Sequence, residues 1–254
     1  MIPKIIHYCW FGRNPKPELA KKCIRSWKKH CPDYEIIEWN EDNYDVTKIP
    51  YIKAAYDAKK WGFVTDYARL DIIFNYGGIY LDTDVEVLKS YDSLLGYSGF
   101  AGFELEEYVN SGLGIGAEAG NPVIKQLMEN YRTQDPFDED GSLRLIPCPK
   151  LDTEVLCSMG LKCDGSLHML DNFIILPTDY LCPIDNEDGI LRKSQNTISI
   201  HHFAASWLTE DQQEQKQKRW KDARKEYIRY APNRFIRKLF GDEKIDSLKR
   251  FLKK

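Results

Sequence analysis

The chain has 254 residues, of which 43% are hydrophobic and 30% are charged, and its formal net charge is −3. This length and apolar content allow one sizeable core in a single α/β domain. The charge is unevenly distributed: residues 212–254 have 15 basic against 6 acidic residues, a balance of +9, and residues 1–211 have 21 against 33, a balance of −12. An acidic body argues against nucleic acid as a partner. It would also repel a nucleotide diphosphate unless a divalent cation bridged the two.

The cysteines and the N-terminal residues indicate the compartment. The seven cysteines are scattered and odd in number, with no CxxC pair, which favours reduced thiols over a disulfide framework or a zinc site. Met1 leads directly into the strand-like residues 5–8, so we expect no signal peptide. No apolar run approaches the length of a membrane span. We therefore expect a cytoplasmic protein.

Strand and helix patterns alternate along the chain. Strands are predicted at 4–10, 34–39 and 79–81, and helices at 17–29, 51–59 and 63–75. This alternation favours a parallel sheet with crossover helices. Further along we expect a strand around Gly112–Gly116, a helix from Pro122 to about Tyr131 capped by Asn121, a surface loop over 132–150, a helix near 153–159, and strands near 173–176 and 197–203.

The most informative stretch is GGIYLDTDV at residues 77–85. Ile79–Leu81 has the pattern of a buried strand that follows a Gly-Gly turn. Two carboxylates come next, at the strand end where α/β folds place ligands. Side chains at i and i+2 of an extended segment point to the same side, so we expect Asp82 and Asp84 to aim at one point. Oxygen ligands of this kind suit Mg²⁺ or Mn²⁺.

A second signal precedes this stretch. Asp66 and Arg69 are three residues apart on one face of the helix predicted at 63–75. The ordered series Asp66-x-x-Arg69, Gly-Gly-Ile-Tyr and Asp82-x-Asp84 resembles glycosyltransferase family 32, whose members carry a DxD motif. That family includes yeast-type mannosyltransferases, bacterial capsule and lipopolysaccharide transferases and, more distantly, the glucosylating domain of large clostridial toxins. The whole series disfavours the alternative, an acidic strand end that caps a neighbouring helix.

The resemblance implies a fold and an activity. The fold is the nucleotide-binding GT-A type: one α/β domain over residues 1–211 with a mixed, mainly parallel sheet, then a basic helical appendage over 212–254. The activity is transfer of a hexose or N-acetylhexosamine, with retention at the anomeric carbon, from a nucleotide sugar to a saccharide or lipid-linked saccharide acceptor. Capsule or lipopolysaccharide synthesis is the expected setting. UDP-sugars are the favoured donors, and Mn²⁺, or else Mg²⁺, is the expected cofactor.

The resemblance also implies roles for residues of the motif. Asp84 binds the metal directly, and Asp82 contacts the metal, the ribose or a water ligand of the metal. Asp66 and Arg69 hold hydroxyls of the donor sugar, and Arg69 also reaches a phosphate oxygen. Tyr80 is a weaker candidate for the same pocket.

Three positions outside the motif receive roles from the resemblance. Trp10, at the end of the first strand, matches the tryptophan that stacks on the nucleotide base; without the resemblance, a core tryptophan is the better interpretation. The segment 201–207 resembles the one that supplies a metal ligand and, through Ser206 and Trp207, closes over the donor diphosphate. Asn110 lies where a polar residue often stands near the reacting sugar, and a role in a turn stays open.

Only one of the two adjacent histidines in this segment can reach the metal, because neighbouring side chains on a strand face opposite ways. The family pattern favours His201 over His202. A core-facing histidine is the alternative.

Two other classes of protein are compatible with a DxD sequence. An aspartyl-nucleophile phosphohydrolase would prefer Thr or Val two residues after the second aspartate, where this chain has Glu86. A non-catalytic calcium- or sugar-binding module is the other class. An EF-hand is excluded, because the sixth loop position counted from Asp82 is Val87 and not glycine.

The C-terminal residues have the composition of an interfacial amphipathic helix. From Arg234 onward, apolar residues recur at helical spacing among lysines and arginines: Phe235, Ile236, Leu239, Phe240, Ile245, Leu248, Phe251 and Leu252. We expect this segment to contact an anionic membrane face, which would give the protein a peripheral position on the inner side of the membrane. The alternative is that the apolar stripe packs on the catalytic domain.

Overall fold

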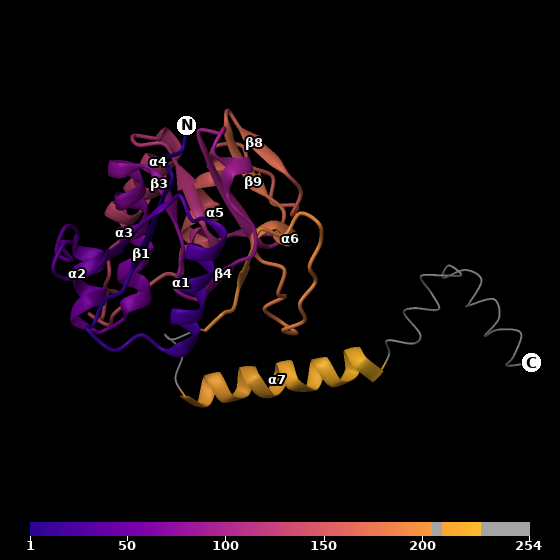
Figure 1. The fold of residues 1–254 in the computed structure, drawn as a ribbon. Helices are drawn as coiled ribbons and strands as arrows, with labels where there is room; N and C mark the ends of the chain where they lie inside the picture. The colour runs from indigo at the N-terminus through magenta and orange to yellow at the C-terminus, as the bar shows by residue number, and fades with distance from the viewer. Residues whose placement is uncertain (205–209, 230–254) are drawn as a thin grey trace, which may run out of the picture. The chain divides into compact units, whose positions relative to one another are not determined.

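The computed structural model describes residues 1–204 and 210–229. The chain divides into two compact units, residues 1–185 with 191–207 and residues 186–190 with 208–254. The strands (Figure 1) are β1 (Ile5–Cys9), β2 (Glu35–Trp39), β3 (Gly78–Tyr80), β4 (Val85–Val87), β5 (Gly99–Leu105), β6 (Tyr108–Val109), β7 (Ile115–Ala117), β8 (His168–Leu170), β9 (Phe173–Leu176) and β10 (Ser199–His201). The helices are α1 (Glu18–His30), α2 (Pro50–Asp57), α3 (Trp61–Tyr76), α4 (Pro122–Thr133), α5 (Cys148–Ser158), α6 (Thr178–Leu181) and α7 (Glu210–Arg229), with 3-10 turns η1 (Asp92–Leu94) and η2 (Ser111–Leu113).

The first unit is built on an eight-stranded sheet of order β2-β1-β3-β7-β5-β9-β8, with β6 beside β5. Strands β2, β1 and β3 are parallel, and β5 is parallel to β9. Because β7 is antiparallel to both β3 and β5, these two groups run in the same direction. Five of the eight strands therefore share one direction, and the predicted fold class, an α/β fold with a mixed, mainly parallel sheet, is confirmed. Strands β4 and β10 form a separate antiparallel pair.

Alternate residues of the strands face two hydrophobic cores. On β3 and the residue after it, Ile79 and Leu81 face one core and Tyr80 faces the other. Helices α2, α3, α4 and α5 cover the core that contains Tyr80, while α1, the β4–β10 pair and α6 cover the opposite face (Figure 1). This two-sided burial explains why the strands are almost continuously apolar.

The Gly-Gly pair turns the chain from α3 into β3. Gly77 and Gly78 have φ values of +66° and +99°, which glycine adopts readily. A Cβ on Gly78 would lie 2.8 Å from the carbonyl oxygen of Ile5 and 2.9 Å from Nε2 of His7. The turn thus lets β3 lie close beside β1, so that both strands end at the same edge of the sheet, where Trp10 and the DxD residues follow.

Most predicted elements are present, with four corrections. Gly112–Gly116 is not one strand, because Asn110 caps the turn η2 and only residues 115–117 pair in the sheet. Helix α5 begins five residues before the predicted 153, with Pro149 in its first turn, where proline is tolerated. Strand β10 is limited to three residues of the predicted 197–203. Asp82–Asp84 is a turn and not an extended segment.

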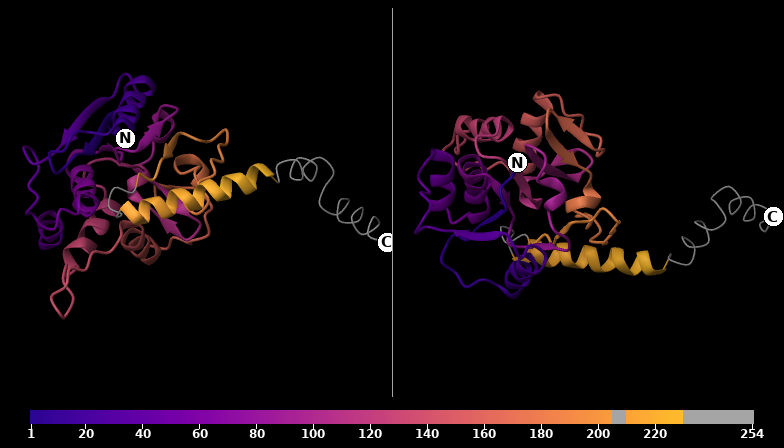
Figure 2. Two further views of the ribbon diagram at one scale, coloured as in Figure 1. Left: turned by 90° about the horizontal axis from the view of Figure 1, so that it is seen from below. Right: turned by 45° about the horizontal axis from the view of Figure 1, so that its top comes forward.

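The loop between α4 and α5 is the surface loop expected over 132–150. It projects from the rest of the unit (Figure 2, left) and includes a β-bridge between Phe137 and Leu143.

The second unit consists, in its described part, of residues 186–190 and α7. The indole N–H of Trp220 donates to the carbonyl oxygen of Asn186 at 3.0 Å, and Arg224 donates to that of Gly189 at 3.0 Å. Most other side chains of α7 are exposed. The helical nature of the predicted appendage is seen over 210–229, while the apolar stripe from Phe235 lies outside the described residues. None of the described helices has the length and apolar character to cross a bilayer.

A buried histidine joins β1, β2 and the end of α3. His7 is fully buried. Its Nδ1 accepts a hydrogen bond from the Trp39 indole at 3.1 Å, and its Nε2–H donates to the carbonyl oxygen of Gly77 at 2.9 Å. This arrangement requires the neutral ring, because a proton on Nδ1 would face the Trp39 donor. Burial lowers the pKa of His7 from 6.5 to about 4.

We predict that this histidine makes the fold sensitive to moderate acid. The unfolded chain takes up a proton near pH 6.5 and the folded chain only near pH 4, so the stability from His7 is lost as the pH falls between these values. The loss should reach about 3 kcal/mol in the free energy of unfolding. Urea unfolding at several pH values should show a steeper decline for the wild type than for His7→Gln. Equal slopes would contradict the neutral ring.

Candidate active site

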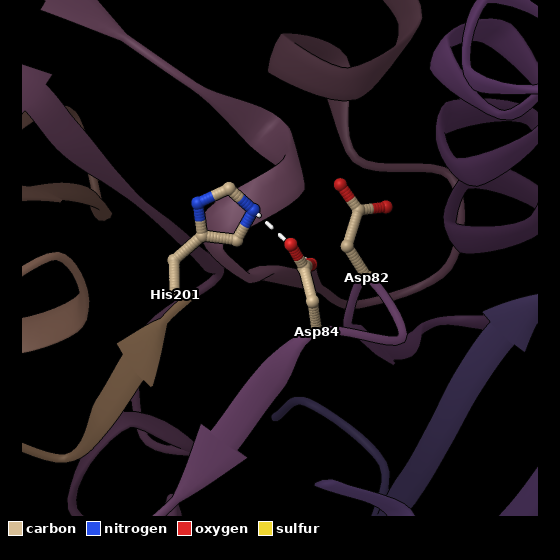
Figure 3. Close-up of side chains that lie close together, drawn as sticks. All are labelled: Asp82, Asp84 and His201. Carbon is tan, nitrogen blue, oxygen red and sulfur yellow. Dashed lines mark ion pairs between the residues drawn. The ribbon is translucent and has the colours of Figure 1, made fainter. Parts of the chain in front are cut away.

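The two DxD carboxylates lie in the tight turn that leads from β3 into β4. The amide of Val85 donates to the carbonyl oxygen of Asp82 at 3.0 Å and closes this turn. His201 is the last residue of β10, the antiparallel neighbour of β4. Figure 3 shows His201 and Asp84 pointing toward each other, with Asp82 beside them. One ligand atom from each of the three residues lies within 4.8 Å of the others.

The three side chains fit a divalent cation. Two carboxylates and an imidazole form a mixed oxygen and nitrogen donor set, in which the carboxylates suit Mg²⁺ or Mn²⁺ and the imidazole suits a transition metal. Nε2 of His201 is 3.2 Å from Oδ1 of Asp84. Neighbouring ligands of an octahedral ion with bonds of about 2.1 Å are about 3 Å apart, so small movements suffice. Across residues 1–204 and 210–229 there is no other group of three side chains with this arrangement.

The surroundings of Asp84 keep it ionised. Its Oδ2 accepts a hydrogen bond from the amide of Ala204 at 2.7 Å, while Oδ1 faces His201. Burial raises the pKa of Asp84, but the charge and hydrogen bond of His201 outweigh burial and lower it to about 2. Burial likewise lowers the pKa of His201, and Asp84 outweighs that effect and raises it. A cation at this site would take the place of the histidine proton.

His201, the last residue of β10, and His202, the residue after it, contact different carboxylates. Nε2 of His202 is 2.8 Å from the carboxylate of Glu86, which also pairs with Lys22 of α1 at 2.8 Å. His201 is therefore the histidine beside Asp84, and its role as a metal ligand stays a prediction. Its Nδ1 has no hydrogen-bond partner among the described residues, and the ring of Phe203 packs against it at 4.4 Å.

A buried arginine, Arg69, links Asp66 on the same helix to Asp82 of the DxD turn. Arg69 is 2% exposed. Its Nη2 lies 3.1 Å from Asp66 and 3.1 Å from Asp82. Its guanidinium also faces the ring of Tyr80 at 5.1 Å. The predicted pair on α3 is thus brought directly to the DxD turn.

Burial controls the protonation of the carboxylates around Arg69. It raises the pKa of Asp66 to about 7, although the arginine acts in the opposite direction. Burial also raises the pKa of Asp82, and Asp84 adds to this effect while Arg69 opposes it. Burial thus favours the protonated form of Asp66, which can donate as well as accept a hydrogen bond.

Asn110 is the turn residue that the sequence left open as an alternative. Its Oδ1 accepts from the amide of Gly112 at 2.6 Å, and its Nδ2 donates to Glu104 at 2.6 Å. A role at the reacting sugar stays a prediction. Gly112 is required by this packing, because a Cβ there would lie 2.4 Å from Oδ2 of Asp82.

Sequence reasoning missed the residues that α5 contributes to this region. Asp152 is 1% exposed, and its Oδ2 accepts from the amide of Ser111 at 3.2 Å. Its Oδ1 has no partner within the described part of the chain, and burial raises its pKa to about 6. Cys148, four residues earlier, lies 3.4 Å from both Arg69 and Asn110. Cys148 and Asp152 are four residues apart, which places them on one face of a helix. A helix predicted to begin at the proline-rich residues 147–149 would therefore have revealed both.

The remaining predicted donor residues have different surroundings. Trp10 is partly exposed at the carboxyl edge of β1, and its indole N–H donates to the carbonyl oxygen of Asn14 at 2.6 Å. It is therefore not a fully buried core tryptophan, and its stacking role stays a prediction. Tyr80 is 1% exposed, and its ring packs against the guanidinium of Arg69. Ser206 and Trp207 lie outside the described residues.

Residues 17–101 match the family model described as the glycosyltransferase sugar-binding region containing a DXD motif. This part of the chain is therefore similar to glycosyltransferases that carry a DXD motif. The matched residues include helix α1, the Asp66 and Arg69 pair of helix α3, and the DxD turn. The match supports the predicted class of enzyme, a glycosyltransferase.

Known proteins with similar sequences are consistent with this match. The chain is 31% identical over 133 residues to inositol phosphoceramide mannosyltransferase 3 of Schizosaccharomyces pombe, which covers 51% of this chain and 37% of that protein. It is 27% identical over 140 residues to inositol phosphoceramide mannosyltransferase 1 of the same yeast, covering 51% and 42%. The chain thus spans about two fifths of the length of these relatives. Among solved structures, the PaToxG glycosyltransferase is similar with a TM-score of 0.47 and 20% identity, over 62% of this chain and 68% of that one.

We predict that Arg69 is needed for stability as well as for donor binding. Arg69→Ala would leave the buried carboxylate of Asp66 and the partly buried carboxylate of Asp82 without their cation, at a cost of about 3–5 kcal/mol in the free energy of unfolding. Asp66→Asn in the same background should recover part of the loss. The matched control is Arg132→Ala, which removes an exposed arginine paired with Glu129 and should change stability by less than about 1 kcal/mol. Urea unfolding measures all three variants, and equal stability of Arg69→Ala and Arg132→Ala would refute the buried network.

Proposed function

We propose that this protein is a metal-dependent glycosyltransferase that moves a hexose or N-acetylhexosamine from a nucleotide sugar to a saccharide-bearing acceptor, with retention at the anomeric carbon. The observation that carries the proposal is the position of the Asp82, Asp84 and His201 cluster directly beside the Asp66–Arg69 pair. A cation site for a diphosphate and a polar pocket for a sugar are what this transfer requires side by side.

The roles follow from the contacts of each residue. Asp82, Asp84 and His201 would hold the cation, which supplies positive charge to the leaving diphosphate. Arg69, already paired with Asp82, adds a fixed positive charge next to that site. Asp66 and Asp152 offer buried carboxyl groups that can bind sugar hydroxyls. Asn110 is held in one orientation by Glu104 and Gly112, so its side chain is preorganised.

The finer features of the proposal come from the resemblance and from the named relatives. We infer membership of glycosyltransferase family 32, with capsule or lipopolysaccharide transferases as functional analogues and the clostridial toxin domain as a distant one. UDP-sugars are the first donors to test, and Mn²⁺ is the first metal. Because the yeast relatives are named as mannosyltransferases acting on inositol phosphoceramide, a mannose donor and a lipid-linked saccharide acceptor belong in the same screen.

We predict that Asp84→Asn abolishes turnover and leaves the fold intact, because Asp84 faces the cation site and not a hydrophobic core. A screen of UDP- and GDP-sugars with Mn²⁺, read out as release of nucleoside diphosphate, should find one active donor for the wild type. EDTA should remove the activity and Mn²⁺ should restore it.

Asp57→Asn serves as the matched control, since Asp57 is exposed and pairs with Lys53 at the surface. It should retain full activity. Activity of Asp84→Asn equal to that of the control would eliminate the metal role. Release of phosphate from simple esters would instead indicate a phosphohydrolase, and binding of calcium and sugar without nucleotide would indicate a binding module.

We propose a cytoplasmic location with peripheral contact to an anionic membrane surface through residues 212–254. This part of the chain has a balance of +9, and each basic residue near such a surface contributes about 1 kcal/mol. In α7, Lys218, Lys221 and Lys225 are exposed. A lipid-linked acceptor would then be presented at the surface to which the enzyme binds.

Liposome co-sedimentation tests this contact. The full chain should pellet with vesicles that contain phosphatidylserine and stay in solution with neutral phosphatidylcholine vesicles. A chain that ends at Tyr230, and the full chain with Lys218, Lys221 and Lys225 changed to Gln, should both bind less. Equal recovery of all three proteins in the anionic pellet would refute membrane contact through this region, and insolubility of the shortened chain would favour packing of the apolar stripe on the protein.

A further inference from the structure

The seven cysteines fall into two groups by their exposure. Five of them are buried: Cys9, Cys23, Cys31, Cys148 and Cys182. Cys157, in the last turn of α5, is exposed, and Cys163, in the segment before β8, is partly exposed. The sulfur atoms of these two residues lie 2.6 Å apart. The two accessible thiols of the described chain are therefore in direct contact.

The end of α5 produces this contact. The amide of Leu161 donates to the carbonyl oxygen of Leu156 at 3.0 Å, and that of Gly160 donates to Cys157 at 3.0 Å. These two bonds form a Schellman motif, in which the residue after the helix adopts a left-handed conformation. Gly160 has φ +102°, as the motif requires. The chain reverses at this glycine and returns toward the last turn of the helix.

Two anchors hold the returning segment in place. Leu161 is 5% exposed and packs in the core covered by α5. Asp164 accepts hydrogen bonds from the amide of Ser166 at 3.0 Å and from Nε2 of His168 at 2.7 Å. Cys163 lies between these anchors, so its position beside Cys157 is fixed on both sides and the pair is preorganised.

The surroundings favour a thiol pair over a metal site. Across the described residues, the Asp82, Asp84 and His201 cluster is the group of three ligands that a metal could join, and no third ligand completes a group with the two cysteines. Burial and the neighbouring sulfur of Cys157 raise the pKa of Cys163 to about 11. Cys163 therefore keeps its proton at neutral pH, and the more exposed Cys157 is the sulfur available for attack on an oxidant.

We propose that Cys157 and Cys163 are a reversible disulfide-forming site, with a low-molecular-weight disulfide of the glutathione type as oxidant. The thiolate of Cys157 attacks one sulfur of the oxidant, which forms a mixed disulfide and releases one glutathione thiolate. Cys163 then passes its proton to a released thiolate, and its sulfur displaces the second glutathione and forms the Cys157–Cys163 bond. The protein loses two electrons and two protons, and one oxidised glutathione becomes two reduced molecules.

The bond would act on the far end of a helix that supports the candidate active site. Cys148, at the start of α5, contacts Arg69 and Asn110, and Cys157 is nine residues further on, about 14 Å along the helix axis. The bond would hold the last turn of α5 without entering the donor pocket. A short cross-link of this kind should raise the midpoint of thermal unfolding by about 3–6 °C.

The test uses the full chain, reduced and then incubated with oxidised glutathione. Free thiols are blocked in denaturant, and tryptic peptides are examined by mass spectrometry. Cleavage after Lys150, Lys162 and Arg192 separates the two cysteines, so the bond appears as a link between peptides 151–162 and 163–192. In the wild type this link should form with a loss of two hydrogens, while Cys182 stays free to be blocked. In Cys163→Ser, Cys157 should end as the mixed disulfide with glutathione.

Two further measurements distinguish an organised pair from two merely exposed thiols. The rise in thermal midpoint on oxidation should occur in the wild type and be absent from Cys157→Ser and Cys163→Ser. Gly160→Ala meets no neighbouring atom within 4 Å, so it acts only through the left-handed φ and should slow closure of the bond. Accumulation of the mixed disulfide in the wild type, or a bond between two chains on a non-reducing gel, would overturn the proposal.

Discussion

The candidate active site depends on one ion network, the buried guanidinium of Arg69 between Asp66 and Asp82. Burying these charges is expensive, and their mutual pairing offsets the cost only when the geometry is good. The network joins α3 to the turn after β3, so the helix and the DxD residues cannot move independently. A ligand bound beside the DxD turn would therefore meet charges that are already in place.

The second requirement is the pairing of β4 with β10. This short ladder brings Ala204 to within hydrogen-bonding distance of Asp84, across 120 residues of sequence. It also separates the two histidines, because His202 contacts Glu86, which itself pairs with Lys22, while His201 faces the acidic turn. The ligand set is therefore a product of strand register, since a shift of one residue would exchange the two rings.

The sequence was sufficient for the fold class and for the central residues of the site, and the reasons differ from residue to residue. The alternation of strands and helices gave the parallel core, and the Gly-Gly pair marked the entry to β3. The convergence of Asp82 and Asp84 was expected from an extended backbone, but it arises from a tight turn closed by Val85. Asp152 and Cys148 were not predicted as site residues because the prolines at 147 and 149 suggested a loop, although proline is well tolerated in the first turn of a helix. The contact of Cys157 with Cys163 depends on a left-handed glycine, and no count of cysteines could reveal it.

The distance in sequence between Asp84 and His201 determines the order in which the residues of the site appear during synthesis on the ribosome. The residues of α3 and the acidic turn have been synthesised before half of the chain is made, whereas the histidine ligand arrives only with β10. Until then the two aspartates lack both the imidazole and the Ala204 amide. The three candidate ligands therefore come together only in a chain whose β10 has paired with β4.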